Sequence, residues 1–196
     1  MPRRGACRHG AGAGALNMST LPTLETARLR LRPYAAADVP ELIPLIGARE
    51  VAATTGRIPH PYTEQDARQF IAAAQGDDEI RLAVTLRSDG CMIGGIGLRL
   101  FLPHQNAELG YWLGVPYWKK GYATEAAREM LHYGFENLRL HRIFVTHFTH
   151  NPASGRILAK LGMRHEGCQR QHIHKWDRFV DLELYGILRQ EWEQGE

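Results

Sequence analysis

The chain has 196 residues, of which 44% are hydrophobic and 23% are charged, and its formal net charge at pH 7 is +3. This size and balance predict one soluble globular domain with a buried core, and so mild a charge does not by itself indicate nucleic-acid binding. No apolar run approaches the roughly 18 residues that span a bilayer, so we expect no membrane partner. The three cysteines, Cys7, Cys91 and Cys168, are far apart, which argues against a disulfide framework or a zinc site and favours a reducing, cytoplasmic location.

The N-terminal segment differs in composition from the rest of the chain. Residues 1–17 include arginines but no acidic residue, and glycine alternates with alanine from Gly10 to Ala15. Such a segment cannot bury an apolar face, so we expect residues 1–20 to be a disordered extension and residues 21–190 to form a single domain. Met18 stands just before the first regular pattern, and we hypothesise that it is the biological start of translation.

Apolar periodicity predicts the elements that follow. Residues 28–32 alternate apolar and charged side chains as a half-buried strand does, and we expect their three arginines to form a solvated face. Thr63 is expected to cap a helix, and Ser88-Asp89-Gly90 indicates a hairpin turn. A hairpin inside an otherwise alternating order of strands and helices favours a mixed sheet in an α+β fold. We expect strands at residues 28–32, 80–86, 91–98, 107–113, 143–148, 164–175 and 179–188, and helices at residues 38–46, 63–75, 124–138 and 152–161.

The segment between the strand at 107–113 and the helix at 124–138 has the composition of a phosphate-binding turn. It reads Tyr117-Trp118-Lys119-Lys120-Gly121-Tyr122-Ala123-Thr124-Glu125-Ala126. The first turn of a helix has N–H groups without intrahelical partners, and the small Gly121 and Ala123 would let a phosphate approach them. Lys119 and Lys120 add positive charge, so we predict a pyrophosphate cradle over residues 119–124. Its residue order is neither that of a P-loop nor that of a dinucleotide-binding fingerprint.

This order resembles motif A of the GNAT family of acetyl-CoA-dependent N-acetyltransferases, Arg/Gln-x-x-Gly-x-Gly/Ala. The motif falls on Trp118, Gly121 and Ala123, so Trp118 replaces the usual Arg or Gln, as in the branch that contains the ribosomal-protein alanine N-acetyltransferases. Further segments match that branch in the same order. They are residues 26–33, 107–113 and 151–163, and the resemblance extends over roughly residues 24–188.

The resemblance implies a fold, a ligand and a reaction. The expected fold is GNAT-like, with a splayed, mostly antiparallel sheet, helices on both faces, and acetyl-CoA in the V-shaped opening beside the strand at 107–113. The implied reaction is transfer of an acetyl group to a primary amine. The backbone of Trp112 and Leu113 would pair with the pantetheine arm as an added strand does, and Tyr111 is expected only to pack around the cofactor. The residues expected to bind acetyl-CoA are Trp112, Leu113, Trp118, Lys119, Lys120, Gly121, Tyr122, Ala123, Thr124 and Asn151.

Two residues are the candidates for proton transfer. Glu108 is the expected general base, because the branch has Glu at this place in the strand. A surface carboxylate and an ion pair that holds a neighbouring strand are the alternatives. Ser154 is the expected general acid, in place of the family's tyrosine, and a helix-capping role is its alternative. Asn151 is expected both to cap the helix at 152–161 and to hold the pantetheine.

Other roles stay open or are not expected. His172 and His174 share one strand face, but no third ligand stands at a recognised spacing, so we expect no metal. The acceptor amine would be the N terminus of a protein such as a ribosomal protein, while a small amine, a polyamine, an amino acid or an antibiotic stays open. The loops at 54–62 and 172–179 are expected to select it. A non-catalytic acyl-CoA-binding module and a ribosome-associated binder are the alternatives of another class, with no direct nucleic-acid binding expected, and the chain would be a monomer or a homodimer.

Overall fold

The computed structural model describes residues 21–73 and 78–195. The predicted extension at residues 1–20 therefore lies outside the described residues, and so do residues 74 and 75 of the helix predicted at 63–75. Within them no helix is long and apolar enough to cross a membrane.

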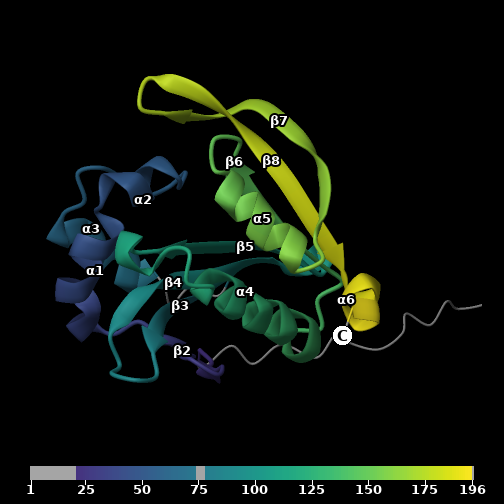
Figure 1. The fold of residues 1–196 in the computed structure, drawn as a ribbon, viewed down its shortest axis with the longest axis horizontal. Helices are drawn as coiled ribbons and strands as arrows, with labels where there is room; N and C mark the ends of the chain where they lie inside the picture. Colours follow the sequence, from purple (N-terminus) through teal and green to yellow (C-terminus); the bar gives the residue numbers. More distant parts are fainter. Residues whose placement is uncertain (1–20, 74–77, 196) are drawn as a thin grey trace, which may run out of the picture.

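One sheet organises the described part of the chain (Figure 1). Its strand order is β1-β2-β3-β4-β5-β6-β8-β7, and every neighbouring pair is antiparallel except β5 and β6, which are parallel. The mixed α+β sheet that the sequence predicts is thus confirmed. The strands are β1 (Leu24–Glu25), β2 (Leu29–Pro33), β3 (Glu79–Leu86), β4 (Met92–Phe101), β5 (Asn106–Leu113), β6 (Arg142–Phe148), β7 (Arg164–Lys175) and β8 (Arg178–Leu188).

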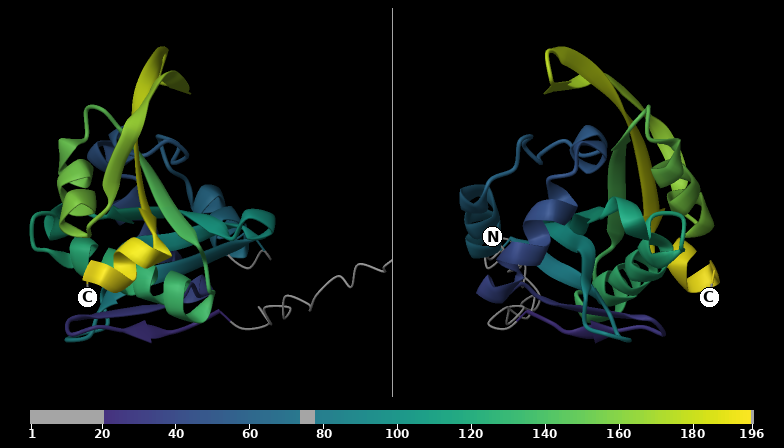
Figure 2. Two further views of the ribbon diagram at one scale, coloured as in Figure 1. Left: turned by 90° about the vertical axis from the view of Figure 1, so that its right-hand side faces the viewer. Right: turned by 60° about the vertical axis from the view of Figure 1, so that its left-hand side comes forward.

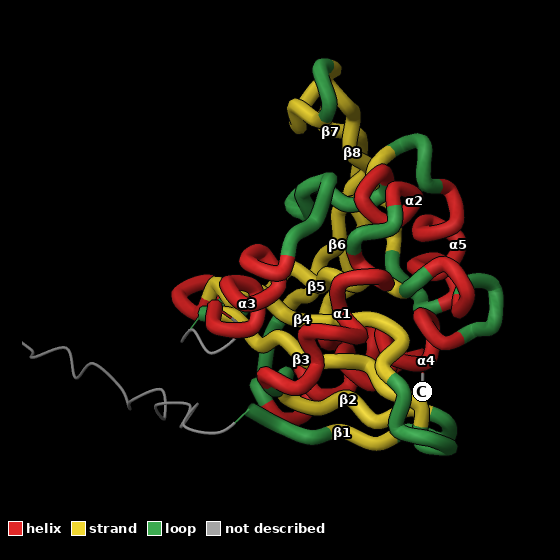
Figure 3. The backbone as a smooth tube through the Cα atoms, turned by 90° about the vertical axis from the view of Figure 1, so that its left-hand side faces the viewer, coloured by secondary structure: helices red, strands yellow, loops and turns green. Residues whose placement is uncertain are grey.

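Helices cover both faces of the sheet, as the family resemblance implies (Figure 3). On one face, α4 packs Ala126, Met130 and Leu131 against buried side chains of the strands, and α5 contacts α4, β6 and β8. On the other face, α1 and α3 enclose a smaller apolar cluster. The helices are α1 (Val39–Ile46), α2 (Arg49–Ala53), α3 (Glu64–Ala73), α4 (Tyr122–His132), α5 (Pro152–Lys160) and α6 (Arg189–Gly195).

Short elements account for most of the differences from the sequence prediction. β1, α2 and α6 were not predicted, because two to seven residues carry too little periodicity to recognise. The helix predicted at 124–138 begins two residues earlier, at Tyr122, and its last turn is a π-helical turn at Tyr133–Asn137. The predicted cap is present, because Thr63 and Asp66 exchange hydrogen bonds at the start of α3.

The β7–β8 hairpin projects beyond the body of the molecule and curves back towards α2 (Figure 2). It is tied to the loop before α3, because the Lys175 ammonium donates a hydrogen bond of 2.6 Å to the carbonyl of Ile58. Burial lowers the pKa of Lys175. The two loops expected to select an acceptor are therefore in contact with each other.

Candidate active site

The sheet opens between its two parallel strands. β5 and β6 pair only at Asn106–Arg142, Ala107–Ile143 and Glu108–Phe144, although both strands continue. A cavity of about 900 Å³ lies at this opening and is lined from both faces of the sheet. Its volume is within the range of small-molecule sites, roughly 300–1,000 Å³.

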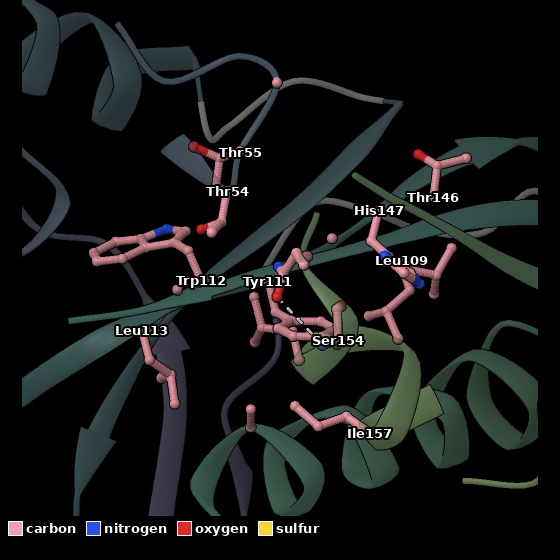
Figure 4. Close-up of a pocket in the computed structure, with 18 of the residues that line it drawn as sticks. Thr54, Thr55, Leu109, Tyr111, Trp112, Leu113, Thr146, His147, Ser154 and Ile157 are labelled. Carbon is pink, nitrogen blue, oxygen red and sulfur yellow. Dashed lines mark hydrogen bonds between the residues drawn. The ribbon is translucent and has the colours of Figure 1, made fainter. Parts of the chain in front are cut away.

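The alternation of side chains along β5 divides the cavity into two sides. Leu109, Tyr111 and Leu113 point to the face covered by α4 and α5, here called the α4 side. Trp112 packs with the α1 cluster on the opposite face, so Glu108, four residues before it, points to that face, here called the α1 side. Figure 4 shows Trp112 with Thr54 and Thr55 on one side of β5, and Tyr111 with Ser154 and Ile157 on the other.

The backbone of β5 offers hydrogen-bonding groups to the opening. The N–H of Gly114 donates to the carbonyl of Ile93 on β4 at 2.9 Å. Because an antiparallel strand alternates its direction of bonding, Trp112 also turns its backbone towards β4, whereas Tyr111 and Leu113 turn theirs towards the opening. The indole N–H of Trp118 donates a hydrogen bond of 2.7 Å to the Leu113 carbonyl. Trp112 and Leu113 were expected to pair with pantetheine. Of these two, only Leu113 turns its amide towards the opening, and the amide of Tyr111 faces the opening as well.

The predicted cradle forms a tight turn at the start of α4. Lys119 and Gly121 have φ of 60° and 83°, in the left-handed region that glycine adopts without strain. The first intrahelical bond runs from the N–H of Glu125 to the carbonyl of Gly121. No side chain in the described part of the chain caps α4, so the preceding N–H groups, including those of Ala123 and Thr124, are the donors that the first turn leaves without an intrahelical partner. The cavity is lined by Trp118, Lys119, Gly121, Tyr122, Ala123 and Thr124, whereas the Lys120 ammonium lies 5.7 Å from the Tyr117 ring centroid.

Arg28, the residue just before β2, supports this turn, a role that its sequence pattern does not indicate. Its guanidinium bonds to the carboxylate of Glu125 at 2.7 Å and to the carbonyl of Lys120 at 3.1 Å. A Cβ on Gly121 would lie 3.3 Å from Arg28 Nη2. Burial acts to raise the pKa of Glu125, but hydrogen bonds from Thr26 and Arg28 outweigh it and hold that pKa below its ordinary value. Arg28 is half exposed, as predicted for a solvated strand face, yet it also fixes the cradle.

Glu108 lies on the α1 side at the point where the strands part. Its carboxylate accepts a hydrogen bond of 3.0 Å from the Thr146 hydroxyl on β6. Its second oxygen lies 3.5 Å from the guanidinium of Arg57, which belongs to the loop between α2 and α3. The carboxylate therefore reaches the opening, bonds to β6 through the neutral Thr146 hydroxyl, and has its ion pair with a loop residue and not with a neighbouring strand, so its role as the base stays a prediction.

Ser154 is joined to a residue that the sequence predicts only to pack. Its hydroxyl lies in the first turn of α5 and is buried, and it shares a hydrogen bond of 2.6 Å with the Tyr111 hydroxyl (Figure 4). Burial raises the pKa of Tyr111 to about 12, so this phenol stays protonated at neutral pH. The Asn151 side chain caps α5 by accepting from the N–H of Ser154 at 3.4 Å, as expected. No sequence pattern links Tyr111 to Ser154, because 43 residues separate them.

The α1 side of the cavity is rich in charge and in aromatic rings. Arg57, Arg81 and Arg99 line it together with Glu79 and Glu108. Phe70 and Phe144 are nearby, and the Arg81 guanidinium lies 5.2 Å from the Phe70 ring centroid. The described residues contain no group of three His, Cys, Asp or Glu that could hold a metal, and the expectation of a metal-independent protein stays a prediction.

Comparisons with known proteins agree on the family. Residues 28–164 match the acetyltransferase (GNAT) domain family. The uncharacterized N-acetyltransferase YnaD of Bacillus subtilis is 38% identical over 131 residues, which cover 67% of this chain and 77% of YnaD. A GNAT-family acetyltransferase of Bacillus anthracis superposes with a TM-score of 0.79 at 28% identity and covers 86% of this chain and 99% of its own.

A structure that is more distant in sequence shares the fold with this chain. Spermidine N-acetyltransferase of Vibrio cholerae, in complex with CoA and spermine, has a TM-score of 0.76 at 21% identity, with 86% of this chain and 99% of that chain covered. The match to the family over most of the chain, the splayed sheet and the relatives lead to one conclusion. The chain belongs to the GNAT family of N-acetyltransferases.

Proposed function

We propose that the chain transfers an acetyl group from acetyl-CoA to a primary amine, by direct attack in a ternary complex, and that a protein N-terminal amine is the first acceptor to test. One observation carries the proposal. A carboxylate and a hydrogen-bonded pair of hydroxyls reach the same opening of the sheet from opposite faces, beside the N-terminus of α4, which no side chain of residues 21–73 and 78–195 caps. The amine would enter from the α1 side, and the donor would lie on the α4 side.

The fit of the donor rests on the cradle and on β5. The unpaired N–H groups of α4 and the left-handed turn at Gly121 suit a pyrophosphate, and the Lys119 ammonium adds charge beside them. Asn151 and the backbone amides of Tyr111 and Leu113 would hold the pantetheine. CoA in the Vibrio cholerae structural neighbour supports this choice of donor.

The proton transfers divide between residues on the two sides of the cavity. Glu108 would accept a proton from the amine nitrogen as the C–N bond forms. A backbone N–H of β5 would donate to the carbonyl oxygen as its negative charge grows. As the C–S bond breaks, Ser154 or Tyr111 would give a proton to the leaving sulfur. Because they share a hydrogen bond, one hydroxyl can donate while the other resupplies it from solvent.

A modest base is sufficient for an N-terminal amine. Its pKa is about 7.7–8.0, whereas that of a lysine side chain is about 10.4. Near neutral pH an appreciable share of N-terminal amines is already uncharged. The resemblance of residues 117–126 to ribosomal-protein N-acetyltransferases favours the same acceptor, and a small amine or amino acid is the runner-up.

A radiolabelled acetyl-transfer screen tests the proposal. Purified protein is incubated with labelled acetyl-CoA and with N-terminal peptides, polyamines, amino acids and aminoglycoside antibiotics. Transfer to at least one amine, lost in Glu108→Gln, is the expected result. Tight binding of acetyl-CoA without transfer to any acceptor would instead support a non-catalytic sensor. RNA binding that weakens as salt rises would favour the ribosome-associated alternative.

A further inference from the structure

Arg57 makes a loose ion pair with the proposed base. Its guanidinium lies 3.5 Å from the carboxylate of Glu108 and 3.8 Å from that of Glu79, and its side chain is 63% exposed. Charge-assisted pairs of good geometry are about 2.7–2.9 Å long. Arg32 and Asp38 form such a pair in this chain, with bonds of 2.7 and 2.8 Å to both carboxylate oxygens. The Arg57–Glu108 contact is therefore one that a ligand can separate at little cost.

The charges around this pair alternate and are positive in sum. Glu79, Arg99 and Glu108 are direct neighbours across β3, β4 and β5 and share the α1 side. Arg81 lies on the same side and pairs with Glu79. The described residues thus contribute three guanidinium groups and two carboxylates to this side of the cavity. Once an ammonium or amine engages Glu108, the remaining groups favour an anion.

Free space adjoins the pair. Gly97 and Gly110 are direct neighbours on β4 and β5. They lie on the same face as Arg99 and Glu108, in the next row of side chains along the strands. A Cβ on Gly110 would meet no atom within 4 Å, so this position opens into the cavity. A small molecule or a chain end can therefore reach Glu108 and Arg57 together.

We infer that the acceptor carries an anionic group close to its amine, with the amine bound by Glu108 and the anion bound by Arg57. In the protein a carboxylate lies beside a guanidinium, which is complementary to an acceptor in which an amine lies beside a carboxylate. When such an acceptor binds, the ion pair within the protein is replaced by two ion pairs between the protein and the acceptor. The anion is the α-carboxylate of an amino acid or the acidic side chain of a peptide's second residue. A polyamine meets the excess of positive charge and is disfavoured. This inference rests on the proposed function and narrows its substrate.

The test compares acid and amide acceptors of equal size. One pair is L-phenylalanine and L-phenylalaninamide, and the other is a pentapeptide amide beginning Ser-Glu and its counterpart beginning Ser-Gln. For at least one pair, wild-type protein is expected to use the acid with a kcat/KM about tenfold or more above that of the amide. Arg57→Gln should remove most of that preference by raising KM for the acid, and Arg57→Lys should retain part of it.

A matched control separates this effect from a general loss of charge. Arg68 is also an exposed arginine, with 65% of its side chain accessible, but it pairs with Glu64 on the outer face of α3. Arg68→Gln should leave the acid preference unchanged. Equal use of acid and amide in both pairs, an equal cost of Arg57→Gln on acid and amide, or no acetylation of either acid overturns the inference. Acetylation of the amides alone would do so while still supporting the proposed acetyl transfer.

Discussion

Glu108 stands where the parallel strands part, with one oxygen bonded to Thr146 and the other near Arg57. If it is the base, Glu108→Gln should lower kcat by about 10²–10⁴-fold. The loss should be largest at low pH, where the amine is protonated, and should shrink as pH rises through the amine's own pKa of about 7.7–8.0. Steady-state pH profiles measure this, and calorimetry should show unchanged affinity for acetyl-CoA. A loss of equal size at every pH would assign Glu108 to positioning.

The Tyr111–Ser154 pair gives a second prediction for single residues. If it supplies the proton to the leaving sulfur, Tyr111→Phe and Ser154→Ala should each lower kcat, with the largest defect at high pH, where solvent protons are scarce. Because the two hydroxyls form one path, the double variant should be little worse than either single variant. Kinetics for the three variants, read beside their melting curves, test this. A Ser154→Ala variant that loses about 1 kcal/mol of stability but no kcat would leave Ser154 as a capping residue.

The turn before α4 is the element on which donor binding depends. Gly121→Glu should abolish acetyl-CoA binding, because it sets a carboxylate where the pyrophosphate would lie and forces a side chain to φ of 83° beside Arg28. Gly90, in the β3–β4 turn, has φ of 76° and open space around it, so Gly90→Glu is a control with a similar backbone cost. Calorimetry should find acetyl-CoA binding lost in the first variant and retained in the second. Wild-type affinity in a folded Gly121→Glu protein would put the cradle elsewhere.

The elements themselves could largely be predicted from the sequence, because their signals are local. Alternation marked β2, runs of apolar residues marked the later strands, and the Thr63 cap and Ser88-Asp89-Gly90 marked a helix start and a hairpin. The supporting contacts of the site were not predictable in this way. Arg28 meets Glu125 across 97 residues, Tyr111 meets Ser154 across 43, and Arg57 meets Glu108 across 51. Such pairs are created by the sheet order and have no periodic signal.

For the molecule as a whole, we predict that no metal is needed. His172 and His174 are exposed on β7, and the described residues offer no third ligand in a common group. Dialysis against a chelator should therefore leave acetyl transfer unchanged. Activity that is lost on chelation and restored by zinc would contradict this and return attention to the histidines.

Stability at alkaline pH reports on buried phenols throughout the fold. Burial raises the pKa of Tyr34 above the ordinary value, and burial raises the pKa of Tyr62 to about 12, as it does for Tyr111. In the unfolded chain these phenols ionise near pH 10, so that state loses its protons first. The free energy of unfolding should thus be insensitive to these groups below about pH 10 and should fall as pH rises from there towards the folded-state values.

Tyr34→Phe isolates this effect. The Tyr34 hydroxyl is buried and makes no hydrogen bond of good geometry among the described residues, although the Trp112 side chain adjoins it, so its removal breaks no well-formed hydrogen bond. Near neutral pH the variant should be as stable as the wild type or slightly more stable, because an unsatisfied buried hydroxyl is itself costly. Above pH 10 its melting temperature should fall less steeply than that of the wild type. Melting curves of both proteins from pH 7 to about pH 11 test this, and two curves that stay parallel over the whole range would show that the Tyr34 phenol does not contribute to alkaline unfolding.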